Sequence, residues 1–398
     1  MPPPIPTWRR IPSSIWALGF VSLLMDVSSE MIHSLLPLFL VTTLHTSAVD
    51  IGLIEGAAEA TALIVKVFSG AISDYLGKRK GLAVLGYGLG AITKPLFAIA
   101  ASANIILLAR LIDRIGKGIR GAPRDALIAD IAPVDIRGAA FGLRQSLDTV
   151  GAFLGPLLAV GLMLLWQDDF RGVFWVAVIP GVLSVLVLFF GVREPAFMHE
   201  NRGNPIRRKN IKRLGPSYWR VVVIGAVFTL ARFSEAFLVL RAQQSSIAIA
   251  LTPLVMVAMN LVYALTAYPF GHLSDRIHHK QLLSWGLSVL ILADLVLASS
   301  SHWPMVALGV GLWGIHMGMT QGLLAKLIAD AVPSDLRGTG FGLFNLVSGV
   351  AMLLASVLAG ALWDISGAPA TFGAGALFAL IAWFMLGWIG RAGIAGKD

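Results

Sequence analysis

The sequence contains no cysteine in its 398 residues, and only 13% of those residues are charged. The lack of cysteine excludes a disulfide framework and any thiolate metal or redox centre. The low charge, together with 57% hydrophobic residues, lies well outside the composition of soluble globular domains. Water is therefore not the main solvent of this chain, and we expect it to fold within a lipid bilayer.

Apolar runs of about 20 residues recur along the whole chain, long enough to cross a hydrocarbon core of roughly 30 Å as helices. Unbroken runs exclude a membrane β-barrel, which would show alternating segments of about 10 residues. The pattern predicts an all-α membrane protein with twelve transmembrane helices, the first of them retained. The expected helices span residues 12–43, 49–73, 81–100, 104–130, 138–165, 172–192, 218–240, 247–272, 281–299, 304–330, 338–364 and 368–391.

Basic residues account for the net charge of +9 and gather in alternate loops between these helices. They include Arg9, Arg10, Lys78, Arg79, Lys80, Arg137, Arg193, Arg207, Arg208, Lys209, Arg276, Lys280 and Arg337. The opposite loops hold little beyond Arg171 and Arg241. This asymmetry is typical of cytoplasmic loops and predicts that both termini lie in the cytoplasm. It also explains the positive net charge of the chain without a nucleic-acid partner.

The two halves of the chain are related in sequence. LIADIAPVDIRGAAFGL at Leu127–Leu143 returns as LIADAVPSDLRGTGFGL at Leu327–Leu343, an offset of 337 − 137 = 200 residues. The polar segment 193–217 lies between the halves, so we expect a six-helix bundle over 1–192, a cytoplasmic linker over 193–217 and a second six-helix bundle over 218–398. Parallel halves of this kind place a binding cavity between them, with access alternating between the two sides.

A loop motif also repeats, at an offset of 275 − 74 = 201 residues. GAISDYLGKRK carries Gly70, Asp74, Gly77, Arg79 and Lys80, and its second copy, GHLSDRIHHKQ, carries Asp275 and Arg276. This loop resembles the signature loop of the major facilitator superfamily, with Tyr75 and His278 departing from the family pattern. We interpret it as a gating element in which the aspartate pairs across the cytoplasmic closure. The alternative, a simple positive anchor, explains the basic residues but not the repeated glycine and aspartate.

A second motif resembles that family's antiporter signature. Gly151, Gly155 and Pro156 in the fifth expected helix match its core, although the trailing glycines are missing, and Arg110 in the fourth helix matches an exporter pattern loosely. The resemblance implies the superfamily fold and proton-coupled export across the inner membrane of a bacterium. Nothing in the sequence indicates an obligate oligomer or a cofactor, so we expect a monomer without one. We place Gly151, Gly155 and Pro156 among the gating residues.

Carboxylates lie inside the expected membrane segments. Asp26, Glu30 and His33 follow an i, i+4, i+7 spacing that puts them on one face of the first helix, and Glu55 and Glu59 share a face of the second. Charged groups at this depth are costly and need a partner, water or a function. We predict that Asp26, Glu30, Glu55 and Glu59 carry the coupled proton. The alternative is structural pairing with neighbouring helices.

The fourth expected helix presents a basic stripe. Arg110, Arg114 and Lys117 lie deep in it, where they neutralise carboxylates or bind an anionic group of the substrate. We expect Arg120 and Arg124 to pair with Asp125 and Asp130, and Arg144 and Arg232 to pair with Asp148 and Glu235. Lys94 is left open between a structural and a functional role.

Further candidates for substrate contact are His33, Asn260, Trp313 and His316. His316 lies near Met317, Met319 and Gln321, so an alternative substrate is a divalent metal such as nickel, cobalt or iron. The basic stripe would repel a bare cation, and no residues suggest a resident metal site. No enzyme motif is present. The sequence therefore predicts a proton-coupled antiporter that exports a small organic, anionic solute or a chelate; metal export, proton-coupled uptake and a non-transporting sensor remain alternatives.

Overall fold

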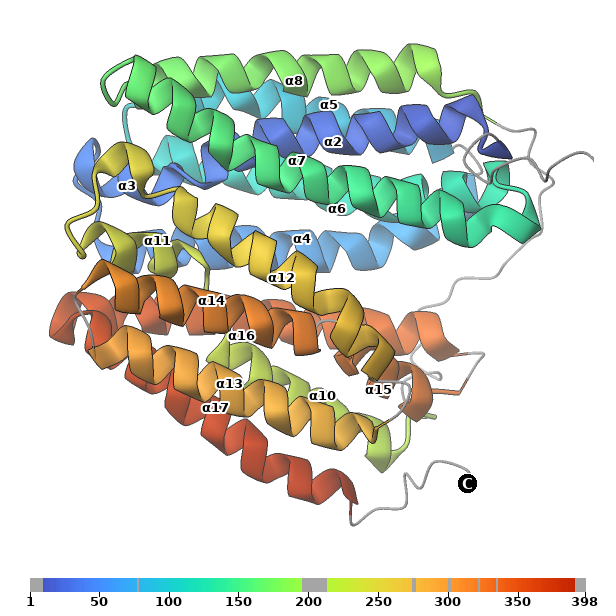
Figure 1. Cartoon of the computed structure of the whole chain (residues 1–398). Coiled ribbons are helices and arrows are strands. Elements are labelled where there is room, and N and C mark those ends of the chain that lie inside the picture. The colour runs from blue at the N-terminus through green and yellow to red at the C-terminus, as the bar shows by residue number, and fades with distance from the viewer. Residues whose placement is uncertain are drawn as a thin grey trace, which may run out of the picture. The chain divides into compact units, whose positions relative to one another are not determined.

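The computed structural model describes residues 10–76, 79–194, 213–273, 277–299, 302–320, 323–333 and 336–390, and these residues form helices and connecting turns without any strand (Figure 1). In the first half the helices are α2 (Ser13–His33), α3 (Leu36–Thr42), α4 (Ala48–Leu76), α5 (Arg79–Ile99), α6 (Ala103–Ile131), α7 (Arg137–Leu165) and α8 (Phe170–Gly191). In the second half they are α10 (Pro216–Ala231), α11 (Ala236–Gln243), α12 (Leu254–Leu273), α13 (His279–Ser299), α14 (Trp303–Thr320), α15 (Leu323–Ala331), α16 (Arg337–Ser366) and α17 (Ala368–Gly390). Short 3-10 turns lie at Val134–Ile136 and Ile249–Leu251.

Eight helices of the described residues are long and apolar enough to cross a membrane. Helices α4 and α6 miss this criterion, and both carry several charged residues along their length. Large apolar side chains are exposed on the outer faces of many helices, as expected when lipid is the solvent. The predicted all-α membrane fold is confirmed, with α2–α3, α10–α11 and α14–α15 each counted as one crossing.

The helices repeat at the offset seen in the sequence. The starts of α5 and α13, of α6 and α14, and of α7 and α16 are each 200 residues apart, as in 337 − 137. The chain forms two compact units, one of residues 1–36 and 65–203 and the other of residues 37–64 and 204–398. The first part of α4 thus packs with the second unit. The boundaries of the sequence-based bundles and of the linker, whose residues 195–212 lie outside the described ones, stay predictions.

The same helix pairs pack in each unit. Helix α2 contacts α7 and α8 in the first unit, and its counterpart α10 contacts α16 and α17 in the second. Likewise α5 packs on α6 and α8, while α13 packs on α14 and α17. Each unit also has an apolar core, which in the first includes Leu18, Met25 and Tyr87 and in the second Tyr218, Val222 and Ile328. The repeat in sequence is therefore a repeat in packing.

Two predicted helices are interrupted at equivalent positions. The expected helix 12–43 breaks at Ser34–Leu35, and the expected helix 218–240 breaks at residues 232–235. Pro37 explains the first break, because its ring clashes with the carbonyl four residues earlier and it lacks an N–H donor. At the second break, the Ser234 N–H donates to Ser356 Oγ at 3.2 Å instead of to its own helix. Discontinuous helices in corresponding positions are typical of binding sites in transporters.

Candidate functional site: a carboxyl and arginine cluster

The first unit holds Asp26 and Glu30 where two helices approach most closely. A Cβ added to Gly151 of α7 would lie 3.0 Å from the Asp26 Cβ and 2.6 Å from the Leu23 carbonyl oxygen. At Gly155 it would lie 2.8 Å from the Glu30 Cβ. Because glycine has no side chain, the α7 backbone can rest directly on α2. The antiporter-like glycines are thus placed against two of the four predicted proton-carrying residues, Asp26 and Glu30.

The Asp26 carboxyl lies beside the carboxyl of Asp148 on α7, within hydrogen-bonding reach. A hydrogen bond between two carboxyl groups requires a proton on one of them, because an ionised carboxylate has no donor. Lys117 and Arg120 lie close enough to act on Asp26 electrostatically. Asp26 therefore has a second carboxyl group on one side and cations on the other.

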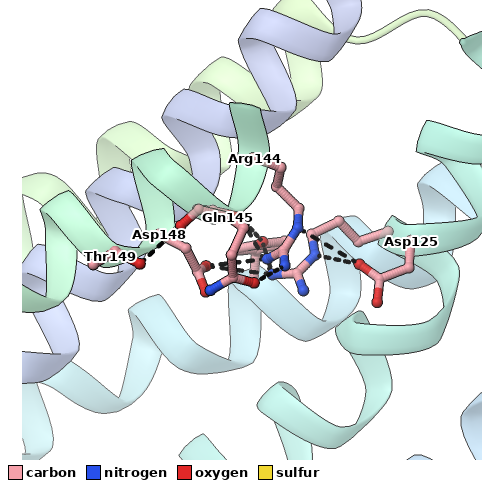
Figure 2. Close-up of polar contacts among 8 residues, drawn as sticks. Asp125, Arg144, Gln145, Asp148 and Thr149 are labelled. Carbon is pink, nitrogen blue, oxygen red and sulfur yellow. Dashed lines mark hydrogen bonds and ion pairs between the residues drawn. The ribbon is translucent and has the colours of Figure 1, made fainter. Parts of the chain in front are cut away.

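Asp148 also belongs to an arginine network, shown in Figure 2. Arg144 Nη1 lies 3.3 Å and Arg124 Nη1 3.9 Å from Asp148 Oδ1, and both arginines reach Asp125, at 4.0 Å and 3.1 Å. Arg144 further donates to Gln145 Oε1 at 2.6 Å. These contacts confirm the predicted pairs of Arg124 with Asp125 and of Arg144 with Asp148. The predicted pairing of Arg120 is different, because Arg120 stacks over the Tyr87 ring, 4.7 Å from its centroid.

Glu30 has basic neighbours as well. Its Oε2 lies 3.5 Å from His33 Nδ1, and Lys117 and Arg114 act on it electrostatically. Arg114 is buried, whereas Lys117 is exposed on its unit. The structure therefore brings together five of the predicted site residues, Asp26, Glu30, His33, Arg114 and Lys117, and Lys117 is the cation among them most open to a ligand.

Lys94 has a structural partner. Its Nζ lies 2.9 Å from Asp113 Oδ1 and donates to Ser29 Oγ at 3.0 Å, and both ions of the pair are buried. Arg110 is also buried and acts electrostatically on Asp113. The question left open for Lys94 is thus answered by a buried ion pair between α5 and α6. Arg110 lies with this pair.

Glu55 and Glu59 lie on the part of α4 that belongs to the second unit. Helix α4 crosses α16 closely there, since a Cβ added to Gly52 would lie 2.0 Å from the Ser356 carbonyl oxygen. Asp364 of α16 accepts from the Ala48 and Val49 amides at 3.0 and 2.9 Å, which caps the start of α4. Glu55 is buried and Glu59 is half-buried. The structure thus separates these two glutamates from the unit that holds Asp26 and Glu30.

The other predicted contacts of the substrate also lie in the second unit. His316 is fully buried, with Nδ1 2.7 Å from the Gly286 carbonyl oxygen and its ring 5.5 Å from the Phe228 ring. Trp313 is buried against Phe233, with ring centroids 5.6 Å apart. Asn260 on α12 is half-buried. Gln321 lies outside the described residues, and no group of three His, Asp or Glu side chains within the described part of the chain is arranged to hold a metal ion.

The predicted gate is described only in part. Gly70 faces Ala122 of α6, Arg79 Nη1 donates to the Ala126 carbonyl at 3.0 Å and pairs with Asp130, and Lys80 Nζ donates to the Phe189 carbonyl at 2.7 Å. Arg79 and Lys80 therefore link the start of α5 to α6 and α8 at this end of the unit. The Asp74 side chain, Gly77, Asp275 and Arg276 lie outside the described residues.

Two functional candidates were missed by the sequence analysis. Asp148 was assigned only to Arg144, because nothing in the sequence shows that it meets Asp26 on another helix. Asp294 of α13 was not considered, although it is fully buried. The sequence could have pointed to Asp294, because this residue occupies the position equivalent to Lys94 in the repeat, 294 − 94 = 200.

Comparisons with known proteins agree with this architecture. The family model of the Major Facilitator Superfamily matches residues 18–253 and 221–395. The MFS-type transporter MJ1317 of Methanocaldococcus jannaschii is 34% identical over 384 residues, which covers 95% of each chain. The quinolone resistance protein NorA of Staphylococcus aureus is 23% identical over 360 residues, 88% of this chain and 90% of its own.

A solved structure shares the fold. It is a bacterial homologue of the human lysosomal transporter Spinster, in an inward-facing and occupied conformation, with a TM-score of 0.76 at 18% identity. The match covers 95% of this chain and 96% of that one. At this identity the likeness concerns the fold alone, which is the twelve-helix arrangement expected from the sequence.

Proposed function

Because the chain belongs to the major facilitator superfamily and is an integral membrane protein of secondary transport, we propose that it exports a small organic solute in exchange for protons. The solute carries an acidic group or is a chelate. The protein acts in the cytoplasmic membrane of a bacterium as a monomer, with both termini in the cytoplasm. The observation that carries the proposal is the contact of Asp26 with Asp148 beside Lys117 and Arg120.

The contact of Asp26 with Asp148 supports proton coupling because it offers a place for an exchangeable proton between α2 and α7. When the proton leaves, two like charges face each other across α2 and α7, and this repulsion disfavours the packed seam. Gly151 and Gly155 allow α2 and α7 to pack so closely that this repulsion acts directly on the contact between the two helices. Protonation and helix packing are therefore linked, which is what alternating access requires.

The basic groups support a solute with an acidic part. Lys117 is exposed, so it offers a charge-assisted hydrogen bond to an anionic group, and Arg114 adds positive charge near the same carboxylate. A bare divalent metal would be repelled by these cations. The basic groups therefore favour an organic solute or chelate over the metal alternative.

Two observations support export. The Gly151–Gly155–Pro156 run lies against Asp26 and Glu30, where an antiporter signature is expected to act. A distant relative, NorA, is described as a quinolone resistance protein, which is consistent with outward transport. For antiport, the solute must displace the proton by occupying the space beside the carboxyl groups.

Proton-coupled uptake is the second candidate, and the neighbours of Glu30 favour it. A bound anion would draw Lys117 and Arg114 away from the carboxylate, which would then accept a proton more readily. Proton and anion would bind together, as in a symporter. The direction of proton movement on binding therefore distinguishes the two candidates.

The test is proton exchange by the purified protein in weakly buffered detergent. Organic anions, organic cations, metal chelates and free divalent metals are added in turn, with pH recorded alongside binding. Release of protons on binding of an organic solute or chelate supports antiport, and uptake supports the symport candidate. Binding of a free metal alone, or binding without proton movement, contradicts the proposal.

A further inference from the structure

Asp294 is a buried carboxyl group for which the described structure provides no hydrogen-bond partner. It lies on α13 in the second unit with 0% exposure, and neither Oδ1 nor Oδ2 is hydrogen-bonded within the described residues. Buried carboxyl groups are ordinarily paired or hydrogen-bonded, so an exception calls for an explanation. None of the contacts assigned to transport above involves Asp294.

The repeat shows how this position differs from its counterpart. At the offset 337 − 137 = 200, Asp294 corresponds to Lys94 and Trp313 corresponds to Asp113. In the first unit these positions form the buried ion pair, 2.9 Å between Lys94 Nζ and Asp113 Oδ1. In the second unit the basic partner is absent and Trp313 takes the place of the acid. The Trp313 Nε1 atom is buried without a partner as well.

The surroundings of Asp294 are apolar. A Cβ added to Gly375 of α17 would lie 2.7 Å from Asp294 Oδ2 and 2.9 Å from Phe233 Cε1, so the carboxyl group and the Phe233 ring share Gly375 as a neighbour. Phe233 also packs on Phe372 of α17 and on Trp313 of α14, with ring centroids 5.5 and 5.6 Å apart. An aromatic cluster thus adjoins the carboxyl group.

The described charged groups on the elements around α13 contact atoms other than the Asp294 carboxyl group. His316 of α14 contacts the Gly286 carbonyl oxygen, eight residues before Asp294 along α13. Arg241 of α11 donates to the Leu297 carbonyl oxygen of α13 at 2.9 Å, and Arg232 lies over the Phe228 ring. Helix α17 has no titratable residue. His279 and Lys280 lie at the start of α13, well before Asp294. The side chains of Lys326 and Asp330 on α15 lie outside the described residues.

A proton is the ligand that fits this site. A metal ion needs several oxygen ligands, whereas the neighbours of Asp294 are aromatic rings and a glycine. The adjoining turn 232–235 interrupts the helix that carries Phe233, and such interruptions adapt more easily than continuous helix. We propose that Asp294 is a second proton-binding site of the transporter, which exchanges its proton when the turn 232–235 moves Phe233 aside. Its part in the transport cycle rests on the proposed proton coupling, whereas proton binding itself does not.

The test is infrared difference spectroscopy of the whole purified protein during a pH titration, which needs no substrate. We expect a carbonyl band of a protonated carboxylic acid that is absent from Asp294→Asn, present in the exposed control Asp135→Asn, and lost reversibly at alkaline pH. Gly375→Ala, which presses a methyl group on Asp294 Oδ2, should shift the band. If Asp294→Asn does not fold, Asp294→Glu should retain an acid band at a different frequency.

Two results would overturn the inference. If the Asp294 band persists at every pH at which the protein is folded, the acid is permanently neutral and structural. If no acid band disappears in Asp294→Asn, the group is ionised throughout. Failure of the proposed function shows separately, because Asp26→Asn would then leave proton exchange on solute binding unchanged while the Asp294 band still titrates.

Discussion

The carboxyl group of Asp26 on α2 lies within hydrogen-bonding reach of that of Asp148 on α7, while the Arg144 guanidinium lies 3.3 Å from the same Asp148. The two aspartates lie 122 residues apart, 148 − 26, and meet where α7 approaches α2 closely at Gly151. Two carboxyl groups that face each other between helices make the packing of those helices sensitive to protonation. This relationship is the physical basis for the coupling proposed above.

Gly155→Ala tests the close packing of α7 on α2. The new methyl would lie 2.8 Å from the Glu30 Cβ and 2.9 Å from the Val27 carbonyl oxygen, so we expect a loss of about 1–3 kcal/mol in stability from overpacking. Gly161→Ala is the matched control on the same helix, because no atom lies within 4 Å of its added Cβ. Thermal unfolding in detergent measures both, and equal unfolding temperatures would contradict the close packing.

Asp113→Asn tests the buried ion pair with Lys94. Removing one partner leaves the other charge buried and uncompensated, which costs about 3–5 kcal/mol. The double variant Lys94→Met with Asp113→Asn removes both charges and should regain much of that stability, and Lys94→Met is the second single variant. Unfolding midpoints of the single and double variants form a thermodynamic cycle. Strictly additive losses would show that the two residues do not act as a pair.

Lys117→Gln tests the proposed contact with an anionic group of the solute. A hydrogen bond to a charged group is worth about 1.5–3 kcal/mol, so we expect roughly a tenfold to hundredfold loss of affinity. Arg114→Gln should act in the same direction, and Arg220→Gln on α10 of the other unit serves as a control. Calorimetry with the solute found by proton exchange gives the affinities. Unchanged binding in both α6 variants would reject a basic contact to the solute.

His316→Ala separates organic-solute transport from metal transport. His316 is fully buried and its Nδ1 already contacts the Gly286 carbonyl oxygen, so we expect reduced stability but no change in the nickel, cobalt or iron tolerance of the host. Accumulation of each metal in cells that produce the wild type or the variant is the measurement. A wild type that lowers metal accumulation, and a variant that does not, would favour metal export instead.

Much of the fold could be predicted from the sequence because each feature is local or repeated. Apolar runs indicated the helices, and the offset between Arg137 and Arg337 reappears in the starts of α7 and α16. The break at Ser34–Leu35 was missed although Pro37 was visible, since apolar periodicity continues through it. The break at 232–235 depends on Ser356 from another helix and has no local signal.

The candidate site was predictable in its residue types but not in its pairing. The spacing of Asp26 and Glu30 placed both on one face, and the structure brings both to α7. Which partner each charge finds depends on how helices pack, so neither the contact of Asp26 with Asp148 nor the pairing of Lys94 with Asp113 follows from spacing. Glu55 and Glu59 share the chemistry of the site but lie in the other unit.

The most direct test of proton coupling compares Asp26→Asn with the wild type in the proton-exchange experiment. Asp168→Asn is the control, because it removes an acid from an exposed loop. We predict that binding of an organic solute or chelate releases protons from the wild type and the control, and that Asp26→Asn binds the same solute with little or no release. If Asp26→Asn releases as many protons as the wild type, Asp26 does not carry the coupled proton and the central claim is wrong.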